Sequence, residues 1–196
     1  MDAHGLTLAC ATRAEERAGR RAGLRTALVG LGAQRGIPDG PVVSYGLAGS
    51  LDGLGRGAVI DAVRVVDERG ETLWEGEGLG VPGAVRGTLL AADRIVDDRA
   101  ERARLHRETG ADSVDMESGG LARRGTLKGV LRAVADTPDR PLSAGVAGAI
   151  RPDGGYAWTG IARAAVRSPR AFTRTTNDGR CALRALAHAT RRWADG

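Results

Sequence analysis

Short aliphatic runs alternate along this chain with helix-forming or glycine-rich segments, and this alternation constrains the fold more than any other feature. Each run predicts a buried strand, because a strand covered on both faces needs no polar positions. Strands are expected at residues 6–11, 26–31, 42–47, 58–66, 87–92, 113–116 and 130–135. Helices are expected at residues 13–22, 98–109, 117–124 and 180–193. The alternation predicts an α/β fold.

We expect a single domain over residues 1–196, since one core usually organises about 100 to 200 residues. Hydrophobic residues make up 42% of the chain, which is enough for a sizeable core. The last part, about residues 151–196, is expected to be helical. It contains a predicted turn at residues 151–155 and a helix break at Ser168 and Pro169.

The net charge of +5 comes from arginines, since Lys128 is the only lysine. Along most of the chain they are interleaved with acidic residues, and aromatic residues make up only 3%. Nucleic-acid binding needs clustered charge and stacking aromatics, so we expect no nucleic-acid partner. The C-terminal third has few acids, which leaves contact with an anionic surface, including peripheral membrane contact, open. Its arginines are Arg163, Arg167, Arg170, Arg174, Arg180, Arg184, Arg191 and Arg192.

The two cysteines, Cys10 and Cys181, form neither a disulfide framework nor a cluster with metal-ligand spacing. The N-terminus has no basic targeting region, and no apolar run reaches the roughly 18 to 20 residues of a membrane span. We therefore expect a cytoplasmic protein without a metal or organic cofactor. The spacing of Gly78, Gly80 and Gly83 matches a dinucleotide fingerprint, but Pro82 occupies the expected helix start, so we predict a loop.

Three segments place polar or small residues where a predicted strand ends. The strand at 42–47 runs into Gly46, Ala48, Gly49 and Ser50, which would let a ligand approach the backbone or simply form a tight turn. The strand at 113–116 delivers Glu117, which could equally stabilise a helix N-terminus. The strand at 130–135 ends at Asp136 before Thr137 and Pro138, where Asp is often only a turn residue.

In this order along the chain, these segments resemble the nucleoside phosphorylase and nucleosidase superfamily. The resemblance covers roughly residues 6–139, and its firmest anchor is Val-Asp-Met-Glu-Ser at 114–118. The superfamily includes purine nucleoside phosphorylases, methylthioadenosine/S-adenosylhomocysteine nucleosidases, futalosine hydrolases and a hopanoid-associated phosphorylase. The last looks closest, because Ala-Thr-Arg-Ala-Glu at 11–15 is similar to its N-terminal motif. The resemblance implies a three-layer α/β/α sandwich with a central mixed sheet.

The resemblance also implies roles for individual residues. Asp136 matches the acid that protonates N7 of the leaving purine, and Glu15 matches the carboxylate that positions the attacking water, with Glu16 as the alternative. Glu117 matches the residue that binds the ribose hydroxyls, and Met116 packs beneath the sugar. The small residues Gly46, Ala48, Gly49 and Ser50 would form a loop beside the anomeric carbon.

Three departures from the family pattern bear on the nucleophile and the base. Ser44 stands where the hexameric phosphorylases have a phosphate-binding arginine, which favours hydrolysis, or phosphate held by another residue such as Arg13. Ile95 and Val96 stand where the nucleosidases place an aromatic residue against the base. Only residues 34–40 follow Ala33 where the family has a whole helix, and a helix needs about 10 to 12 residues to register, so we expect that helix to be missing.

The function expected from this resemblance is cleavage of the N-glycosidic bond of an adenosine-type nucleoside, by water or with phosphate as co-substrate. The substrate could be an adenosyl-hopanoid in hopanoid biosynthesis, or a methylthioadenosine- or futalosine-type nucleoside. The resemblance also implies a homodimer. A nucleoside-binding protein of the same fold without turnover is the alternative from another class, and an arginine-driven nucleic-acid or lipid-surface binder is a second.

Overall fold

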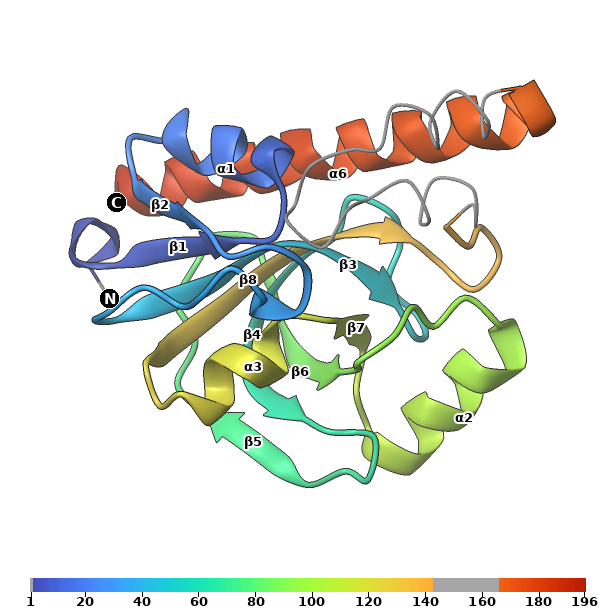
Figure 1. The fold of residues 1–196 in the computed structure, drawn as a ribbon, viewed down its shortest axis with the longest axis horizontal. Coiled ribbons are helices and arrows are strands. Elements are labelled where there is room, and N and C mark those ends of the chain that lie inside the picture. The colour runs from blue at the N-terminus through green and yellow to red at the C-terminus, as the bar shows by residue number, and fades with distance from the viewer. Residues whose placement is uncertain (1, 143–165) are drawn as a thin grey trace.

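One mixed sheet of eight strands organises the chain, whose computed structural model describes residues 2–142 and 166–196 (Figure 1). The strands are β1 (Thr7–Cys10), β2 (Arg25–Leu28), β3 (Val42–Ser50), β4 (Val59–Val66), β5 (Thr72–Glu75), β6 (Val85–Ala91), β7 (Ser113–Asp115) and β8 (Leu127–Asp136). The helices are α1 (Arg13–Arg20), α2 (Arg99–Thr109), α3 (Ser118–Arg123) and α6 (Pro169–Ala194), with short 3-10 turns η1 (Ala3–Gly5) and η2 (Leu31–Ala33).

Five of the strands close into a ring. Around it, β3 pairs with β7, β7 with β6, β6 with β4, β4 with β8, and β8 again with β3. The parallel pairing of β3 and β8 sets Gly46 beside Arg132 and Gly49 beside Asp136. The carboxyl ends of two central parallel strands therefore meet at one place, and α/β proteins bind ligands at the carboxyl ends of their parallel strands.

Helices cover the sheet on both sides, which confirms the three-layer α/β/α prediction. Figure 1 shows α1 and α6 together on one side and α3 on the other. The core under α1 and α6 includes Leu8, Tyr45 and Leu186, all fully buried. The core under α3 includes Val65 and Leu121, also fully buried. None of the described helices is long and apolar enough to cross a membrane.

Every predicted strand is present, but two details of the sheet differ from the expectation. β3 continues to Ser50, so the prediction that Gly46, Ala48, Gly49 and Ser50 form a loop is wrong. These residues stay in the sheet because β8 pairs with β3 as far as Gly49, and β7 pairs with Gly49 and Ser50. The strand β5 was not predicted. It has no aliphatic run, and its position follows from its antiparallel pairing with β4.

The four predicted helices are present, and α6 is longer than expected because it begins at Pro169. Proline suits the first turn of a helix, where its missing N–H has no intrahelical partner. Residues 34–40 are irregular and contain no helix, so the expected loss of a helix after Ala33 is confirmed. The predicted turn at 151–155 lies outside the described residues.

The glycine-rich segment at 78–83 is a loop, as predicted, and it wraps around the carboxylate of Asp61. Asp61 lies on β4 and is buried. Its carboxylate accepts hydrogen bonds from the backbone nitrogens of Leu79, Gly80 and Val81 at 2.8, 2.8 and 3.2 Å. The amides that a dinucleotide site would offer to phosphate are thus used by a side chain of the protein itself.

We expect Asp61→Asn to lower the free energy of unfolding by about 1–3 kcal/mol, because the amide nitrogen of Asn would face backbone donors. Urea unfolding of both proteins measures the loss. Asp67→Asn is the matched control, since Asp67 accepts backbone hydrogen bonds from Arg69 and Glu71 in a surface turn. An equal loss in the two variants would contradict the role given to the buried carboxylate.

Candidate active site

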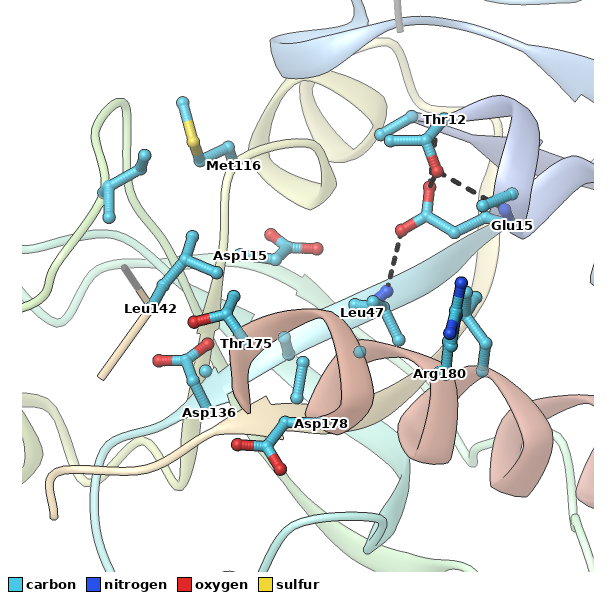
Figure 2. A pocket seen from close by; sticks show the side chains of 18 of the residues that line it. Thr12, Glu15, Leu47, Asp115, Met116, Asp136, Leu142, Thr175, Asp178 and Arg180 are labelled. Atoms are coloured by element: carbon cyan, nitrogen blue, oxygen red, sulfur yellow. Dashed lines mark hydrogen bonds between the residues drawn. The ribbon is translucent and has the colours of Figure 1, made fainter. Parts of the chain in front are cut away.

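A cavity of about 970 Å³ lies where the carboxyl ends of β3 and β8 face α1 and α6 (Figure 2). Most of the residues predicted for the site line it: Glu15, Ala48, Gly49, Ile95, Val96, Met116, Glu117 and Asp136. Gly46 and Ser50 lie in β3 without lining it, and the exposed Arg13 does not line it either. The structure therefore brings the predicted carboxylates Glu15, Glu117 and Asp136 into one cavity. Arg13, the residue predicted to bind phosphate, lies outside it.

Asp136 ends β8, and its carboxylate pairs with the guanidinium of Arg102 from α2. Arg102 is 1% exposed and also donates to the carbonyls of Val96 and Ser50, at 2.9 Å each. The turn after β8 is closed by backbone hydrogen bonds between Thr137 and Arg140, and not by the side chain of Asp136. Burial raises the pKa of Asp136, and the charge of Arg102 opposes this rise. Asp136 is thus a fixed carboxyl group whose burial favours the protonated form, while Arg102 favours the ionised form.

Glu15 is held by backbone and side-chain donors at the start of α1. Its Oε2 accepts from the backbone N–H and the hydroxyl of Thr12, at 2.7 and 3.0 Å, and Thr12 caps the helix in return. Its Oε1 accepts from the backbone N–H of Leu47 at 2.9 Å. Glu16 instead pairs with Arg20 at 2.8 Å. Of the two acids, only Glu15 lines the cavity.

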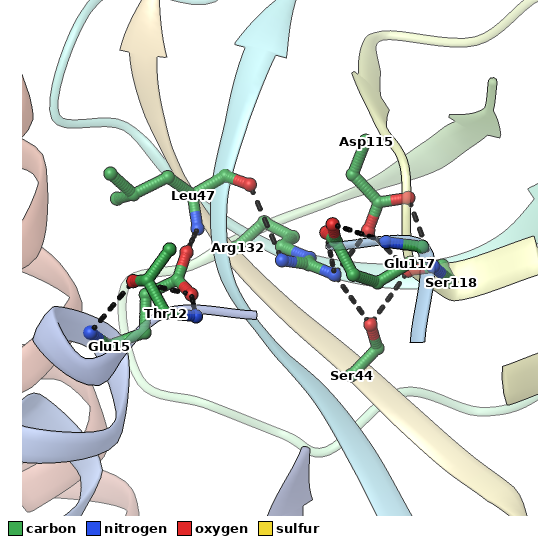
Figure 3. A network of polar contacts seen from close by, with 9 residues as sticks. Thr12, Glu15, Ser44, Leu47, Asp115, Glu117, Ser118 and Arg132 are labelled. Atoms are coloured by element: carbon green, nitrogen blue, oxygen red, sulfur yellow. Dashed lines mark hydrogen bonds and ion pairs between the residues drawn. The ribbon is translucent and has the colours of Figure 1, made fainter. Parts of the chain in front are cut away.

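Arg132 is the centre of a buried polar network between β3, β8 and α3 (Figure 3). Its guanidinium pairs with Asp115 and lies 3.3 Å from Glu117 Oε2. It also donates to the hydroxyl of Ser44 at 2.7 Å, and Ser118 donates to the same hydroxyl at 2.8 Å. Because Arg132 is fully buried, these partners compensate the cost of removing its charge from water.

Glu117 is positioned by this network and not by the helix that follows it. It is the N-cap residue of α3, but its side chain makes no capping hydrogen bond. Its Oε1 accepts from the backbone N–H of Gly32 at 3.3 Å. Burial raises the pKa of Glu117 to about 8, the charges of Asp115 and Glu15 add to this rise, and Arg132 opposes it.

Gly46 leaves the space that Glu15 and Arg132 occupy. A Cβ atom built on it would lie 2.6 Å from Arg132 Nη1 and closer still to Glu15 Oε1. Real Cβ atoms essentially never come so close to another heavy atom. The glycine therefore supports the site without lining the cavity.

Sequence reasoning missed both buried arginines. Arg132 had a usable signal, because a charged residue inside the apolar run at 130–135 needs buried partners. Arg102 had none, since it lies in a helix rich in polar residues. Among the described residues, no group of three or more His, Cys, Asp and Glu side chains is arranged to hold a metal ion.

We expect the free energy of unfolding to fall as the pH rises from about 5 to 8, because the folded protein keeps a proton on Glu117 that the unfolded chain releases near its ordinary value of 4.5. That contribution is complete below pH 4.5 and is lost as the pH passes through 8. Glu117→Gln should flatten the dependence, as urea unfolding at several pH values would measure. Glu16→Gln is the control. An unchanged slope in Glu117→Gln would contradict the assignment.

No family model matches the sequence, and no curated protein matches it. Solved structures do match. A futalosine hydrolase of Helicobacter pylori strain 26695 has a TM-score of 0.67 at 14% identity, over 98% of both chains. An Arabidopsis thaliana 5′-methylthioadenosine nucleosidase has 0.64 at 14%, over 100% of this chain and 96% of that one.

A third match is a 5′-methylthioadenosine/S-adenosylhomocysteine nucleosidase from Neisseria meningitidis in complex with methylthio-immucillin-A. Its TM-score is 0.64 at 16% identity, over 96% of this chain and 97% of that chain. The agreement covers nearly the full length of each pair. The chain has the fold of these nucleosidases.

Proposed function

We propose that this protein cleaves the N-glycosidic bond of a purine nucleoside. The observation that carries the proposal is the arrangement of Glu15, Glu117 and Asp136, which come from three separate segments and line one cavity. Similar structures include a futalosine hydrolase and methylthioadenosine nucleosidases, which supports this class of reaction.

Asp136 is proposed as the general acid. As the bond between the anomeric carbon and N9 breaks, its electron pair moves into the purine, and a proton from Asp136 to N7 neutralises the developing charge. A general acid must be protonated near the working pH, which the raised pKa of this buried carboxyl favours. Arg102 positions the carboxylate through its contacts with β3 and the segment before α2.

Glu117 and Met116 are proposed to hold the sugar. The sugar-binding role needs the ionised form of Glu117, which the charge of Arg132 favours and burial opposes. That carboxylate would accept hydrogen bonds from the 2′ and 3′ hydroxyls and stabilise positive charge on the ribosyl ring, an interaction that strengthens in the transition state. Met116 lines the cavity next to Glu117 and supplies an apolar surface. Ile95 and Val96 line the same cavity and would pack against the base with aliphatic groups.

Glu15 is proposed to position the nucleophile. Its carboxylate is fixed by Thr12 and Leu47, and it shares the space beside Gly46 with the guanidinium of Arg132. A water molecule held by Glu15 inside the cavity would attack the anomeric carbon and transfer a proton to the carboxylate. The fixed orientation of Glu15 would reduce the entropy cost of placing that water.

Water is favoured over phosphate as the nucleophile. Arg13 lies outside the cavity, and Ser44 accepts a hydrogen bond from Arg132. The two buried arginines of the site are each occupied by carboxylates, Arg102 by Asp136 and Arg132 by Asp115 and Glu117. A phosphate ion beside these buried arginines would have to compete with the carboxylates, and the further arginines that line the cavity from α1 and α6 are exposed. Phosphorolysis, an adenosyl-hopanoid substrate and a homodimer stay predictions.

The test is release of free adenine from adenosine, methylthioadenosine and an adenosyl-lipid, each with and without phosphate. We expect release without phosphate, and we expect Asp136→Asn to lower kcat by about 10² to 10⁴, because the leaving base then lacks its acid. Asp139→Asn is the matched control, since the side chain of Asp139 is 74% exposed and pairs at the surface with Arg99.

Release that requires phosphate would replace hydrolysis by phosphorolysis. Release that survives Asp136→Asn would remove Asp136 from the reaction. Folded protein that releases no base but binds adenosine in calorimetry would support the alternative of a nucleoside-binding protein without turnover.

A further inference from the structure

The two helices that lie together on one side of the sheet, α1 and α6, carry the excess positive charge of this protein (Figure 1). Residues 13–25 and 166–196, which contain these helices, hold 12 arginines and 4 acidic residues. The rest of the chain holds 17 basic and 20 acidic residues. The net charge of +5 therefore arises from these two segments, while the remainder of the sequence is slightly acidic.

The arginines of these helices are exposed, whereas most of the acids are not. Glu15 and Asp178 are buried, Glu16 is half-buried, and Asp195 after α6 is the one exposed acid of the two segments. Ten exposed arginines belong to α1, its C-cap and α6, and we call them the arginine face: Arg13, Arg17, Arg20, Arg21, Arg170, Arg174, Arg180, Arg184, Arg191 and Arg192. Within residues 2–142 and 166–196, only Arg20 among the ten forms an ion pair, with Glu16. The described part of the protein thus leaves this face uncompensated.

The exposed side of α6 is polar along its whole length. The helix has 26 residues and is therefore about 39 Å long. Its exposed positions recur three or four residues apart, at 170, 174, 177, 181, 184, 188 and 191, as one side of a helix requires. The large apolar side chains that are exposed in the described residues are Val85, Ile95 and Val166, and none of them belongs to α1 or α6. The arginine face can therefore attract a partner by charge but has no large apolar group to insert into it.

An anionic bilayer fits this face better than a protein or a nucleic acid. Protein interfaces usually have an apolar centre, which the face lacks. Single-stranded nucleic acid stacks on aromatic side chains, and none of the aromatic residues within 2–142 and 166–196 is exposed. Duplex DNA takes up a helix in its major groove, but α6 lies against the sheet with α1 beside it (Figure 1). A bilayer of anionic lipids needs none of these features, because it presents a plane of negative charge to the arginines.

We propose that the arginine face docks this protein on the surface of an anionic lipid bilayer, with α6 lying along the membrane plane. The arginines contact the phosphate groups of the lipids, which guanidinium binds through paired hydrogen bonds, and no helix enters the hydrocarbon. Each arginine close to such a surface contributes roughly a fivefold gain in binding, so several together suffice for attachment. This inference goes beyond the proposed function and does not rest on it.

Sedimentation with sucrose-loaded vesicles measures the docking. The full chain is mixed with vesicles made of equal parts phosphatidylcholine and phosphatidylglycerol, or with vesicles of phosphatidylcholine alone, and the bound fraction is followed as lipid is added. We expect the protein to bind the mixed vesicles and not the neutral ones. Binding should weaken as sodium chloride is added, because salt screens the attraction between exposed charges.

The triple variant Arg170→Gln/Arg174→Gln/Arg192→Gln removes three charges from the arginine face, and none of the three residues lines the cavity of the candidate active site. At roughly fivefold per arginine, the variant should bind the mixed vesicles about 100-fold more weakly than the unmodified protein. Urea unfolding checks that the variant is folded, which we expect because all three side chains are exposed.

The matched control is the triple variant Arg69→Gln/Arg107→Gln/Arg123→Gln, which lowers the net charge by the same amount. Its three positions lie away from α1 and α6, in the turn between β4 and β5, in α2 and in α3. These arginines are also exposed and form no ion pair within the described residues. The control should bind the mixed vesicles as the unmodified protein does. An equal loss in the two variants would mean that net charge alone drives binding, and the proposal would be wrong.

Three other results would also overturn the proposal. The first is that the unmodified protein does not bind the mixed vesicles at low salt. The second is equal binding to neutral vesicles, which would indicate insertion of apolar groups. The third is tighter binding to duplex DNA than to the mixed vesicles, lost in the same α6 variant, which would assign the arginine face to nucleic acid. No nucleoside takes part in these measurements, so their outcome is separate from that of the adenine-release test.

Discussion

The buried guanidinium of Arg132 is the interaction on which the rest of the site depends. It lies between Asp115, Glu117 and Ser44, so three segments of the chain meet at one positive charge. A fully buried charge is tolerated only when partners surround it, and removing one partner of such a pair commonly costs about 3–5 kcal/mol. The same contacts that stabilise this region of the fold therefore fix the carboxylate proposed to hold the sugar.

The two candidate catalytic acids are held by different parts of the structure. Glu15 is fixed by Thr12 at the start of α1 and by the backbone N–H of Leu47 in β3. Asp136 depends on Arg102, which reaches across from α2. The carboxyl group proposed as general acid is thus held by a side chain with its own charge, while the carboxylate proposed to orient the nucleophile is held by neutral donors.

Most of the fold was predictable because its strands are buried and therefore apolar. The aliphatic runs identified seven strands, but β5, with Thr72 and Glu75 at its ends, offered no such run. The carboxylates could be found from their places at strand ends and from the family resemblance. Arg102 could not, since an arginine in a polar helix is usually exposed, and its burial follows from tertiary contacts with Val96 and Ser50. The predicted loop of Gly46 to Ser50 was wrong, because small residues can also remain in a strand that has partners on both sides.

The ring of strands limits where a second copy of this protein could add a strand to the sheet. Closure of β3, β7, β6, β4 and β8 leaves β2 and β5 as the two ends of the described strand order. Each is only four residues long, and Arg25 begins the first of them. Short edge strands with a charged residue are poor templates for another strand. Strand-to-strand addition between copies is thus disfavoured at the edges, and the backbone of the strands that carry the candidate site is not available to it.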